Sequence, residues 1–292
     1  MVCCACVRET GAVCSSVEVF ECRGSERSCQ IAMTNHLTAS SARCRRAVAR
    51  AAGRLGALAR VALPQRCELC VAPCRDALLC VECERSLPRV IPACPVCGLP
   101  SAGNRVCGAC IATPPPYAAT IVAYAYAFPT DRLLQQIKFG GRIALAAWAG
   151  AALAAAVDIE LARRPNDHPD SIVALPLAPA RQRERGFNQA REIAVHVARR
   201  TGLPLSVPLV RVTAGPPQTT LPWARRGRNV RGAFAMSLQA GSAVRGKRIA
   251  LVDDVMTTGA TVAEAARTLM SAGAGRVECW VVARTLPRRS AA

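Results

Sequence analysis

The sequence predicts an α/β fold, in which helices flank a parallel sheet, preceded by a small cysteine-rich module. Three observations predict it. Segments typical of strands and helices alternate between residues 119 and 283, four Cys-x-x-Cys pairs lie between residues 67 and 110, and a hydrophobic segment ending in two aspartates leads through a small-residue turn into a helix. Strands that alternate with helices over this length indicate a parallel sheet.

The 292 residues are enough for a medium domain and a small module, and we divide them into three parts. Residues 1–62 are expected to be a partly disordered extension, with a basic helix over 42–62. Because residues 1–32 have no periodicity, we expect translation to start at Met33. The cysteine module takes residues 63–112, and three prolines at 114–116 form a stiff linker to the α/β domain of residues 117–292.

The elements of the α/β domain follow from their hydrophobic patterns and their stop signals. The expected strands are the alternating segment 119–128 and the buried segments 172–177, 248–252 and 277–283. The expected helices are 131–139, stopped by Gly140 and Gly141; the long segment 143–161; 188–200, closed by Gly202; and 258–272, ended by Gly273. A basic loop is expected between the second strand and the third helix.

No membrane span is expected, because the longest apolar stretch, 143–159, is interrupted by Asp158 and a bilayer requires about 20 apolar residues. The N-terminus lacks the organisation of a secretory signal, so the expected location is cytoplasmic. The 38 Lys and Arg against 19 Asp and Glu give a formal charge of +19, which attracts polyanions of any kind. An arginine-rich, GC-rich coding sequence is an equal explanation of this charge.

Eight of the 17 cysteines form four Cys-x-x-Cys pairs, namely Cys67 with Cys70, Cys80 with Cys83, Cys94 with Cys97, and Cys107 with Cys110. Two intervening residues allow a tight turn that directs both thiolates to one ion, and two such turns complete a tetrahedral zinc site. Two structural zinc ions, paired in sequence order, are the simplest interpretation. One zinc with a degenerate second site, or an iron–sulfur cluster, remains an alternative.

The strongest motif is the strand–turn–helix segment 249–261. Asp253 and Asp254 follow the strand, and Thr257, Thr258 and Gly259 form the turn. Backbone N–H groups at a helix N-terminus bind anions, and glycine lets a phosphate approach closely. Paired carboxylates suit the hydroxyls of a ribose, or a Mg²⁺ ion bound with them. The segment is therefore predicted to hold a ribose 5-phosphate group.

Two arginine-rich segments supply positive charge. Arg181, Arg183 and Arg185 follow the second strand and are expected to clamp a pyrophosphate group, since guanidinium geometry matches phosphate oxygens. Asn188 is expected to cap the next helix. The segment 218–234, which contains Arg228, is expected to be a mobile flap that closes over the site and excludes water.

The turn resembles the PRPP-binding motif of type I phosphoribosyltransferases. The resemblance implies that Asp253 and Asp254 contact the ribose hydroxyls of PRPP, bound with Mg²⁺. It also implies that the 5-phosphate is wrapped by Met256, Thr257, Thr258, Gly259, Ala260 and Thr261.

Three further motifs extend this resemblance. Residues 63–284 resemble the ComF family. The motifs that carry this resemblance are Arg183-Glu-Arg-Gly-Phe-Asn-Gln-Ala, Gln136-Ile-Lys-Phe-Gly and the pattern of 218–234. These phosphoribosyltransferase-like proteins are associated with natural competence and DNA uptake, and a double zinc ribbon precedes their main domain.

The resemblance implies three alternative functions. One is a phosphoribosyltransferase linked to DNA uptake, which acts on an unidentified acceptor by positioning and charge stabilisation. The second is a non-catalytic protein that binds single-stranded DNA, together with competence-machinery proteins. The third is a regulator that senses PRPP without turnover.

Overall fold

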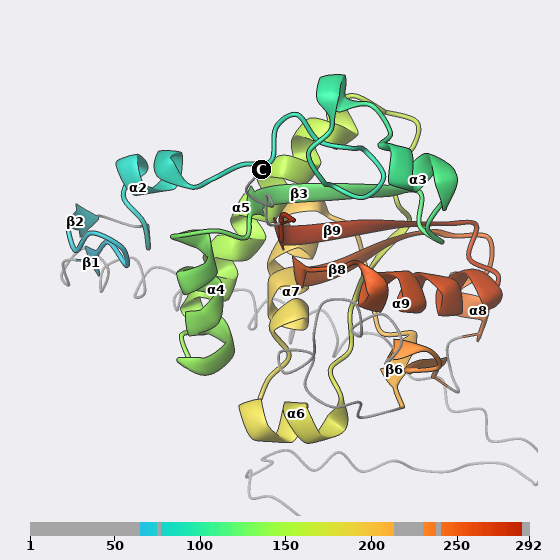
Figure 1. Cartoon of the computed structure of the whole chain (residues 1–292). Helices are drawn as coiled ribbons and strands as arrows, with labels where there is room; N and C mark the ends of the chain where they lie inside the picture. The colour runs from blue at the N-terminus through green and yellow to red at the C-terminus, as the bar shows by residue number, and fades with distance from the viewer. Residues whose placement is uncertain (1–64, 75–76, 213–229, 238–240, 288–292) are drawn as a thin grey trace, which may run out of the picture. The chain divides into compact units, whose positions relative to one another are not determined.

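The computed structural model describes residues 65–74, 77–212, 230–237 and 241–287 (Figure 1). These residues belong to the compact unit Leu58–Ala292. The expected helix over 42–62, the start at Met33, and residues 218–229 of the expected flap, including Arg228, lie outside the described residues.

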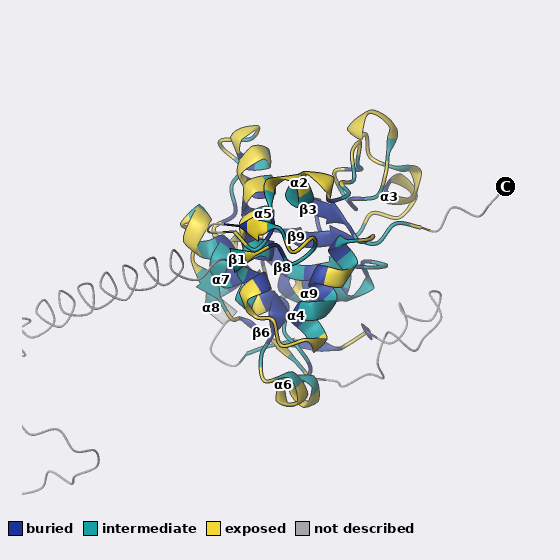
Figure 2. Ribbon diagram, turned by 90° about the vertical axis from the view of Figure 1, so that its left-hand side faces the viewer, coloured by how far each residue is buried: buried dark blue, intermediate teal, exposed yellow. Residues whose placement is uncertain are grey.

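A five-stranded sheet forms the centre of the α/β domain, in the order β3-β9-β8-β4-β5. All of its neighbouring strands are parallel, as the alternating pattern predicts. The strands are β3 Ala119–Ala125, β4 Ser171–Ala174, β5 Leu205–Ser206, β8 Arg248–Met256 and β9 Arg276–Arg284. Strands covered on both faces are continuously hydrophobic, and β8 and β9 are buried along most of their length (Figure 2).

Helices cover both faces of this sheet (Figure 1). One face packs against α4 Thr130–Phe139, α5 Ala144–Ala162 and α7 Gln189–Thr201, and the other packs against α9 Ala260–Ser271. Alternate strand residues enter the two cores: Val252 and Trp280 face the first, whereas Leu251 and Val281 face the second. This is the two-residue period of a strand, and it fixes the face onto which each site residue of β8 projects.

α7 shows how the local sequence determines these helices. Ala190, Ile193, Ala194 and Val197 recur at helical spacing and are all buried. The Asn188 side chain accepts a hydrogen bond from the Ala190 N–H at 3.0 Å, so it is the N-cap that the sequence predicts.

α5 is the one helix in the described part of the chain that has the length and hydropathy of a membrane span. It packs against α7, β3 and α4, and its buried residues include Leu145, Leu153 and Val157. The contacts are those of a core helix.

The cysteine module precedes the sheet in short elements: β1 Gln65–Arg66, β2 Pro73–Cys74, α2 Val81–Ser86, the 3₁₀ helix η1 Ala102–Asn104, and α3 Gly108–Ala112. β1 and β2 form an antiparallel pair, and an isolated antiparallel bridge joins Ala93 to Pro100.

The structure differs from the sequence prediction in several places, including the unexpected strand β5 and the end of β4 at Ala174. The expected basic loop is wrong, because residues 179–185 form the helix α6 Pro179–Arg185, which ends at Gly186 with φ of 77°. β8 does not end at Val252 but continues to Met256, so both aspartates lie within the strand. Strands β6 Leu209–Arg211 and β7 Phe234–Met236, which form a small antiparallel sheet, and the short helix α8 Gly241–Val244 were not expected.

Candidate functional site

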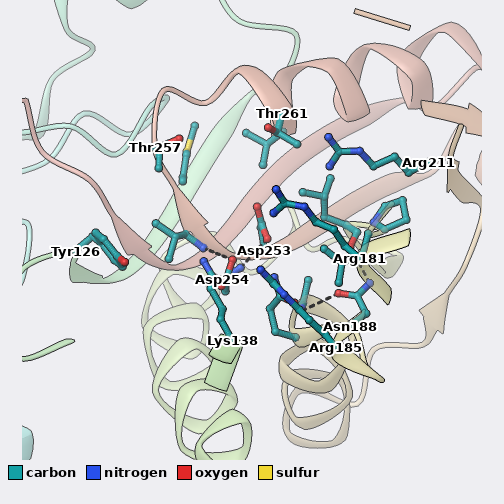
Figure 3. Close-up of a pocket in the computed structure, with 18 of the residues that line it drawn as sticks. Tyr126, Lys138, Arg181, Arg185, Asn188, Arg211, Asp253, Asp254, Thr257 and Thr261 are labelled. Atoms are coloured by element: carbon teal, nitrogen blue, oxygen red, sulfur yellow. Dashed lines mark hydrogen bonds and ion pairs between the residues drawn. The ribbon is translucent and has the colours of Figure 1, made fainter. Parts of the chain in front are cut away.

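A cavity of about 350 Å³ lies beyond the carboxyl ends of β4 and β8 (Figure 3). Its lining combines the end of β8 and the turn that follows with residues from α4, α6, the start of α7 and β6. Ligands of α/β proteins collect at this edge of the sheet, because the loops there are not part of the core.

The turn between β8 and α9 presents unused backbone donors. Within the described residues, the N–H groups of Thr257, Thr258 and Gly259 form no hydrogen bond. They lie directly before the N-terminus of α9, whose dipole favours negative charge. Consecutive free N–H groups at such a position form an anion-binding cradle.

Gly259 shapes this cradle for two reasons. Its φ of +84° lies in the left-handed region that side chains avoid. A Cβ atom at this position would lie 2.8 Å from Cε of Met256 and 3.2 Å from Oη of Tyr117. The turn therefore requires glycine at this position.

The two aspartates differ in their surroundings. Asp254 is 4% exposed and forms an ion pair with Lys138 of α4, whose Nζ lies 2.7 Å from Oδ2 of the carboxylate. Burial alone would lower the pKa of Lys138, but the charge of Asp254 raises it above its ordinary value, so the lysine stays protonated. Asp254 thus has a cationic partner within the protein.

Asp253 has no such partner among the described residues. Its Oδ1 accepts the N–H of Asp254 at 2.9 Å, and the carboxylate borders the cavity. Burial, followed by the neighbouring charge of Asp254, raises its pKa well above the ordinary carboxyl value. A cation or a hydroxyl donor entering the cavity would relieve this unfavourable environment.

Two of the predicted arginines face the cavity and one does not. Arg181 and Arg185 lie one helical turn apart on α6 and line the cavity, whereas Arg183 lies on the exposed side of the same helix. In Figure 3, Arg181 and Arg185 point toward the aspartates. Burial, and then the charge of Arg181, lowers the pKa of Arg185. The cavity thus brings like charges together, an arrangement that an anion would stabilise.

Some of the remaining predicted residues of the turn line the cavity and others do not. Met256 and Thr261 line the cavity with Thr257 and Gly259, while Thr258 and Ala260 do not. The Thr258 hydroxyl instead accepts the Ala260 N–H at 3.2 Å, which supports the first turn of α9.

Sequence reasoning missed two cations of the cavity. Lys138 belongs to the motif Gln136-Ile-Lys-Phe-Gly, so the sequence marked this residue. The sequence did not indicate that Lys138 forms an ion pair with Asp254. Arg211 lies in β6, and its guanidinium lies 5.5 Å from the centre of the Phe234 ring. Nothing in the local sequence indicates that this short strand returns to the site.

The eight predicted ligand cysteines form two clusters, paired in sequence order. One contains Cys67, Cys70, Cys80 and Cys83, the other Cys94, Cys97, Cys107 and Cys110, and in each the sulfur atoms lie within 4.8 Å of one another. Zinc–sulfur bonds of about 2.3 Å in a tetrahedron place sulfurs about 3.8 Å apart. The Cys70–Cys80 and Cys97–Cys107 sulfurs are 3.6 and 3.7 Å apart, so both clusters fit structural zinc.

The two clusters repeat one another at a constant offset of 27 residues, from Cys67 to Cys94 and from Cys83 to Cys110. The backbone follows the same offset. Sγ of Cys67 accepts the N–H of Cys80 at 3.4 Å, and Sγ of Cys94 accepts the N–H of Cys107 at 3.3 Å. The module is therefore two copies of one ribbon.

Comparisons with known proteins agree with both parts of the structure. A model described as a double zinc ribbon domain matches residues 58–111, and a model described as a phosphoribosyl transferase domain matches residues 188–291. The chain is 36% identical over 232 residues to the DNA utilization protein YhgH of Salmonella typhimurium, covering 77% of this chain and 99% of that protein.

More distant relatives carry competence names. Competence protein F of Haemophilus influenzae is 28% identical over 212 residues, or 70% of this chain and 90% of that protein. Competence protein ComFC of Bacillus subtilis is 26% identical over 205 residues, or 68% of this chain and 80% of that protein. The chain therefore belongs to the ComF family, in which a double zinc ribbon precedes a phosphoribosyltransferase domain.

Proposed function

We propose that the protein binds PRPP with Mg²⁺ in the cavity and transfers its phosphoribosyl group. The observation that carries the proposal is the row of unused N–H groups at Thr257, Thr258 and Gly259, next to the unpaired carboxylate of Asp253. A phosphate at the N–H groups and ribose hydroxyls at the carboxylate would satisfy both at once.

The donors around Asp253 suit a magnesium ion bound together with the sugar. Oδ2 of Asp253 accepts no hydrogen bond from the described residues, so it is available as an oxygen ligand. Mg²⁺ is commonly held by one or two carboxylates and the phosphate groups of a substrate. When bound, it would neutralise the charge that develops on a departing pyrophosphate.

The arginines are the groups that we assign to that pyrophosphate. Arg181, Arg185 and Arg211 approach the cavity from α6 and β6. Their charges would stabilise pyrophosphate more as it leaves than while it is bound to the ribose, which is how such a site accelerates a reaction. Asp254, held by Lys138, supports the neighbouring Asp253, because its N–H donates to that carboxylate.

We carry a role in DNA uptake or DNA utilisation over from the names of the relatives. Direct binding of single-stranded DNA is the second candidate function, and one observation favours it. Phe139 borders the cavity while 72% exposed, and the Arg185 guanidinium lies 5.1 Å from the centre of its ring. An exposed aromatic ring beside arginines is a stacking platform for bases.

Calorimetry with PRPP and Mg²⁺ tests the proposal. Wild-type protein should bind PRPP, Asp253→Asn should abolish binding, and Arg185→Ala should weaken it about tenfold or more, because one charged hydrogen bond is worth about 1.5–3 kcal/mol. Arg183→Ala is the matched control and should bind like the wild type.

The opposite result separates the two candidates. Absence of PRPP binding, together with oligonucleotide binding that survives Asp253→Asn and weakens steeply with salt, would replace the enzymatic proposal with the DNA-binding one. In that case Phe139→Ala should weaken oligonucleotide binding, because it removes the stacking surface.

A further inference from the structure

Arg284, the last residue of β9, connects the second zinc ribbon to the phosphate-binding turn. The residue is 3% exposed, and its guanidinium lies between the two structures. Nε donates to the backbone carbonyl of Cys97 at 2.8 Å, while Nη1 donates to the carbonyl of Met256 at 2.8 Å and to that of Thr257. One planar side chain thus holds a zinc-ligand residue and the first residues of the turn.

The hydrogen bonds from Arg284 to the turn hold the same peptide groups that carry the unused N–H donors. The carbonyls of Met256 and Thr257 belong to peptide groups whose N–H ends are those of Thr257 and Thr258. A peptide group is planar, so fixing its carbonyl oxygen fixes the direction of its N–H. Arg284 therefore fixes the directions of two of the three unused donors, the N–H groups of Thr257 and Thr258.

The ribbon end of this connection is equally constrained. The Thr120 hydroxyl donates to the carbonyl of Val96 at 2.6 Å, and its N–H donates to the carbonyl of Pro95 at 2.9 Å. Gly98, with φ of +67°, packs so closely that an added Cβ would lie 2.7 Å from Val122. The segment from Cys94 to Gly98 cannot shift independently of β3 and Arg284.

Charge gives a second reason for the coupling. No carboxylate forms an ion pair with Arg284 among the described residues. Cys97 and Cys110 of the second cluster are, with Tyr117, the acidic groups that act on Arg284, and four thiolates around one divalent zinc ion carry a net negative charge. A formed zinc site would therefore add to the hydrogen bonds that stabilise this buried guanidinium.

The first ribbon has a different attachment. Its Glu84 accepts hydrogen bonds from Tyr124 of β3 and, at 2.7 Å, from Nε1 of Trp148 of α5. Glu68 is paired with Arg142, next to α5. These contacts fix the first ribbon to the helical face of the sheet, and no hydrogen bond in the described structure joins it to the turn.

We infer that Arg284 is a positioning residue through which the second zinc site, and not the first, sets the conformation of the phosphate-binding turn. The inference goes beyond the proposed function, because it concerns the ligand-free protein and holds whether or not PRPP is the ligand. If PRPP does bind, loss of the second zinc would reduce its affinity without removing any residue that contacts it.

Amide hydrogen exchange of the zinc-bound full chain, resolved by NMR, tests the inference. The amides to follow are Thr285, whose N–H donates to Met256, and Ala263, whose N–H donates to Gly259. Arg284→Met should accelerate their exchange about tenfold or more, because it removes the charged hydrogen bonds that hold the turn. The Gly202 amide, at the end of α7, should not change, which excludes global destabilisation.

Two cysteine variants form a matched pair for the zinc sites. Cys67 and Cys94 are both buried and accept equivalent backbone N–H groups. Cys94→Ser should accelerate exchange at Thr285 and Ala263 as Arg284→Met does, whereas Cys67→Ser should leave both unchanged. Unchanged exchange in Arg284→Met, or equal effects of the two cysteine variants, would overturn the inference.

Graded removal of zinc from the wild type decides the question if a variant does not fold. A chelator should accelerate exchange at Thr285 in step with the Gly98 amide of the second ribbon, and not with the equivalent Val71 amide of the first. Exchange at Thr285 that follows Val71, or that does not change when zinc is lost, would contradict the inference.

Discussion

At the scale of single residues, the two aspartates of the motif differ: Asp254 is paired with a lysine, and Asp253 is available to a ligand. Both aspartates line the cavity, but Asp254 forms an ion pair with Lys138 of α4, whereas Asp253 has no ion-pair partner among the described residues. The motif predicts two equivalent contacts to a ribose. The geometry favours one direct contact, from Asp253, and one ion pair that supports it.

The Lys138–Asp254 pair should be important for stability. Lys138→Met leaves a buried carboxylate without a cation, which should lower the free energy of unfolding by about 3 kcal/mol. Urea denaturation measures this loss. The double variant Lys138→Met/Asp254→Asn should recover much of it, since the carboxylate that lost its cation is then removed as well. A single variant as stable as the wild type would show that the pair is not coupled.

The ionised carboxylate of Asp253 should lower the stability of the folded protein, although it is proposed to bind the ligand. Burial and the charge of Asp254 raise its pKa in the folded protein, so the folded state binds this proton more tightly than the unfolded chain. The stability that depends on this group is therefore greatest below the ordinary carboxyl pKa, and it is lost as pH rises toward the higher folded value.

Asp253→Asn should consequently raise the Tm at neutral pH, by about 2–4 °C. The difference from the wild type should shrink at about pH 4, where the unfolded carboxyl is half protonated. Thermal denaturation across this range measures it. An Asp253→Asn variant that is less stable than the wild type at neutral pH would contradict the environment that we assign to the carboxylate.

At the scale of elements, hydrophobic periodicity predicted the long elements and failed on the short ones. α7 and α9 carry helical apolar spacing and β8 a continuous apolar run, so their patterns are sufficient. α6 has no buried residue and consists of Pro179 followed by mostly charged residues, so no apolar face indicates a helix. β6 and β7 have three residues each, too few for a strand period to appear.

The crossing of α5 and α7 depends on Gly150. A Cβ atom here would lie 2.5 Å from Cβ of His196 and 2.9 Å from the carbonyl oxygen of Ile193. Alanine is favoured over glycine by about 1 kcal/mol in a helix interior, but the clash should outweigh this gain. Gly150→Ala should therefore destabilise the protein by about 1–2 kcal/mol in urea denaturation. A variant more stable than the wild type would show that α5 and α7 can move apart without a loss in the free energy of unfolding.

Helical spacing also explains why the candidate site was only partly predictable. A helix over residues 179–185 places Arg181 and Arg185 on one side and Arg183 on another, so recognising α6 in the sequence would have separated the three arginines. Arg211 could not have been found in this way, because it reaches the cavity through the pairing of β6 with β7, a contact between segments far apart in the sequence.

At the scale of the whole described molecule, each zinc ribbon is joined to the α/β domain by its own set of hydrogen bonds. The first ribbon is fixed to the helical face through Glu84, and the second is joined through Arg284 to the turn between β8 and α9. The cysteine spacing predicts both metal sites but not these attachments, since Glu84 and Arg284 have no distinguishing local pattern. The turn between β8 and α9 is the feature on which the proposed function depends.

A crystal of the protein soaked with PRPP and Mg²⁺ tests that turn most directly. The 5-phosphate should lie within hydrogen-bonding distance of the N–H groups of Thr257, Thr258 and Gly259, with the ribose hydroxyls at Asp253. A turn whose N–H groups are hydrogen-bonded within the protein, or a PRPP molecule whose phosphate lies elsewhere, would contradict it.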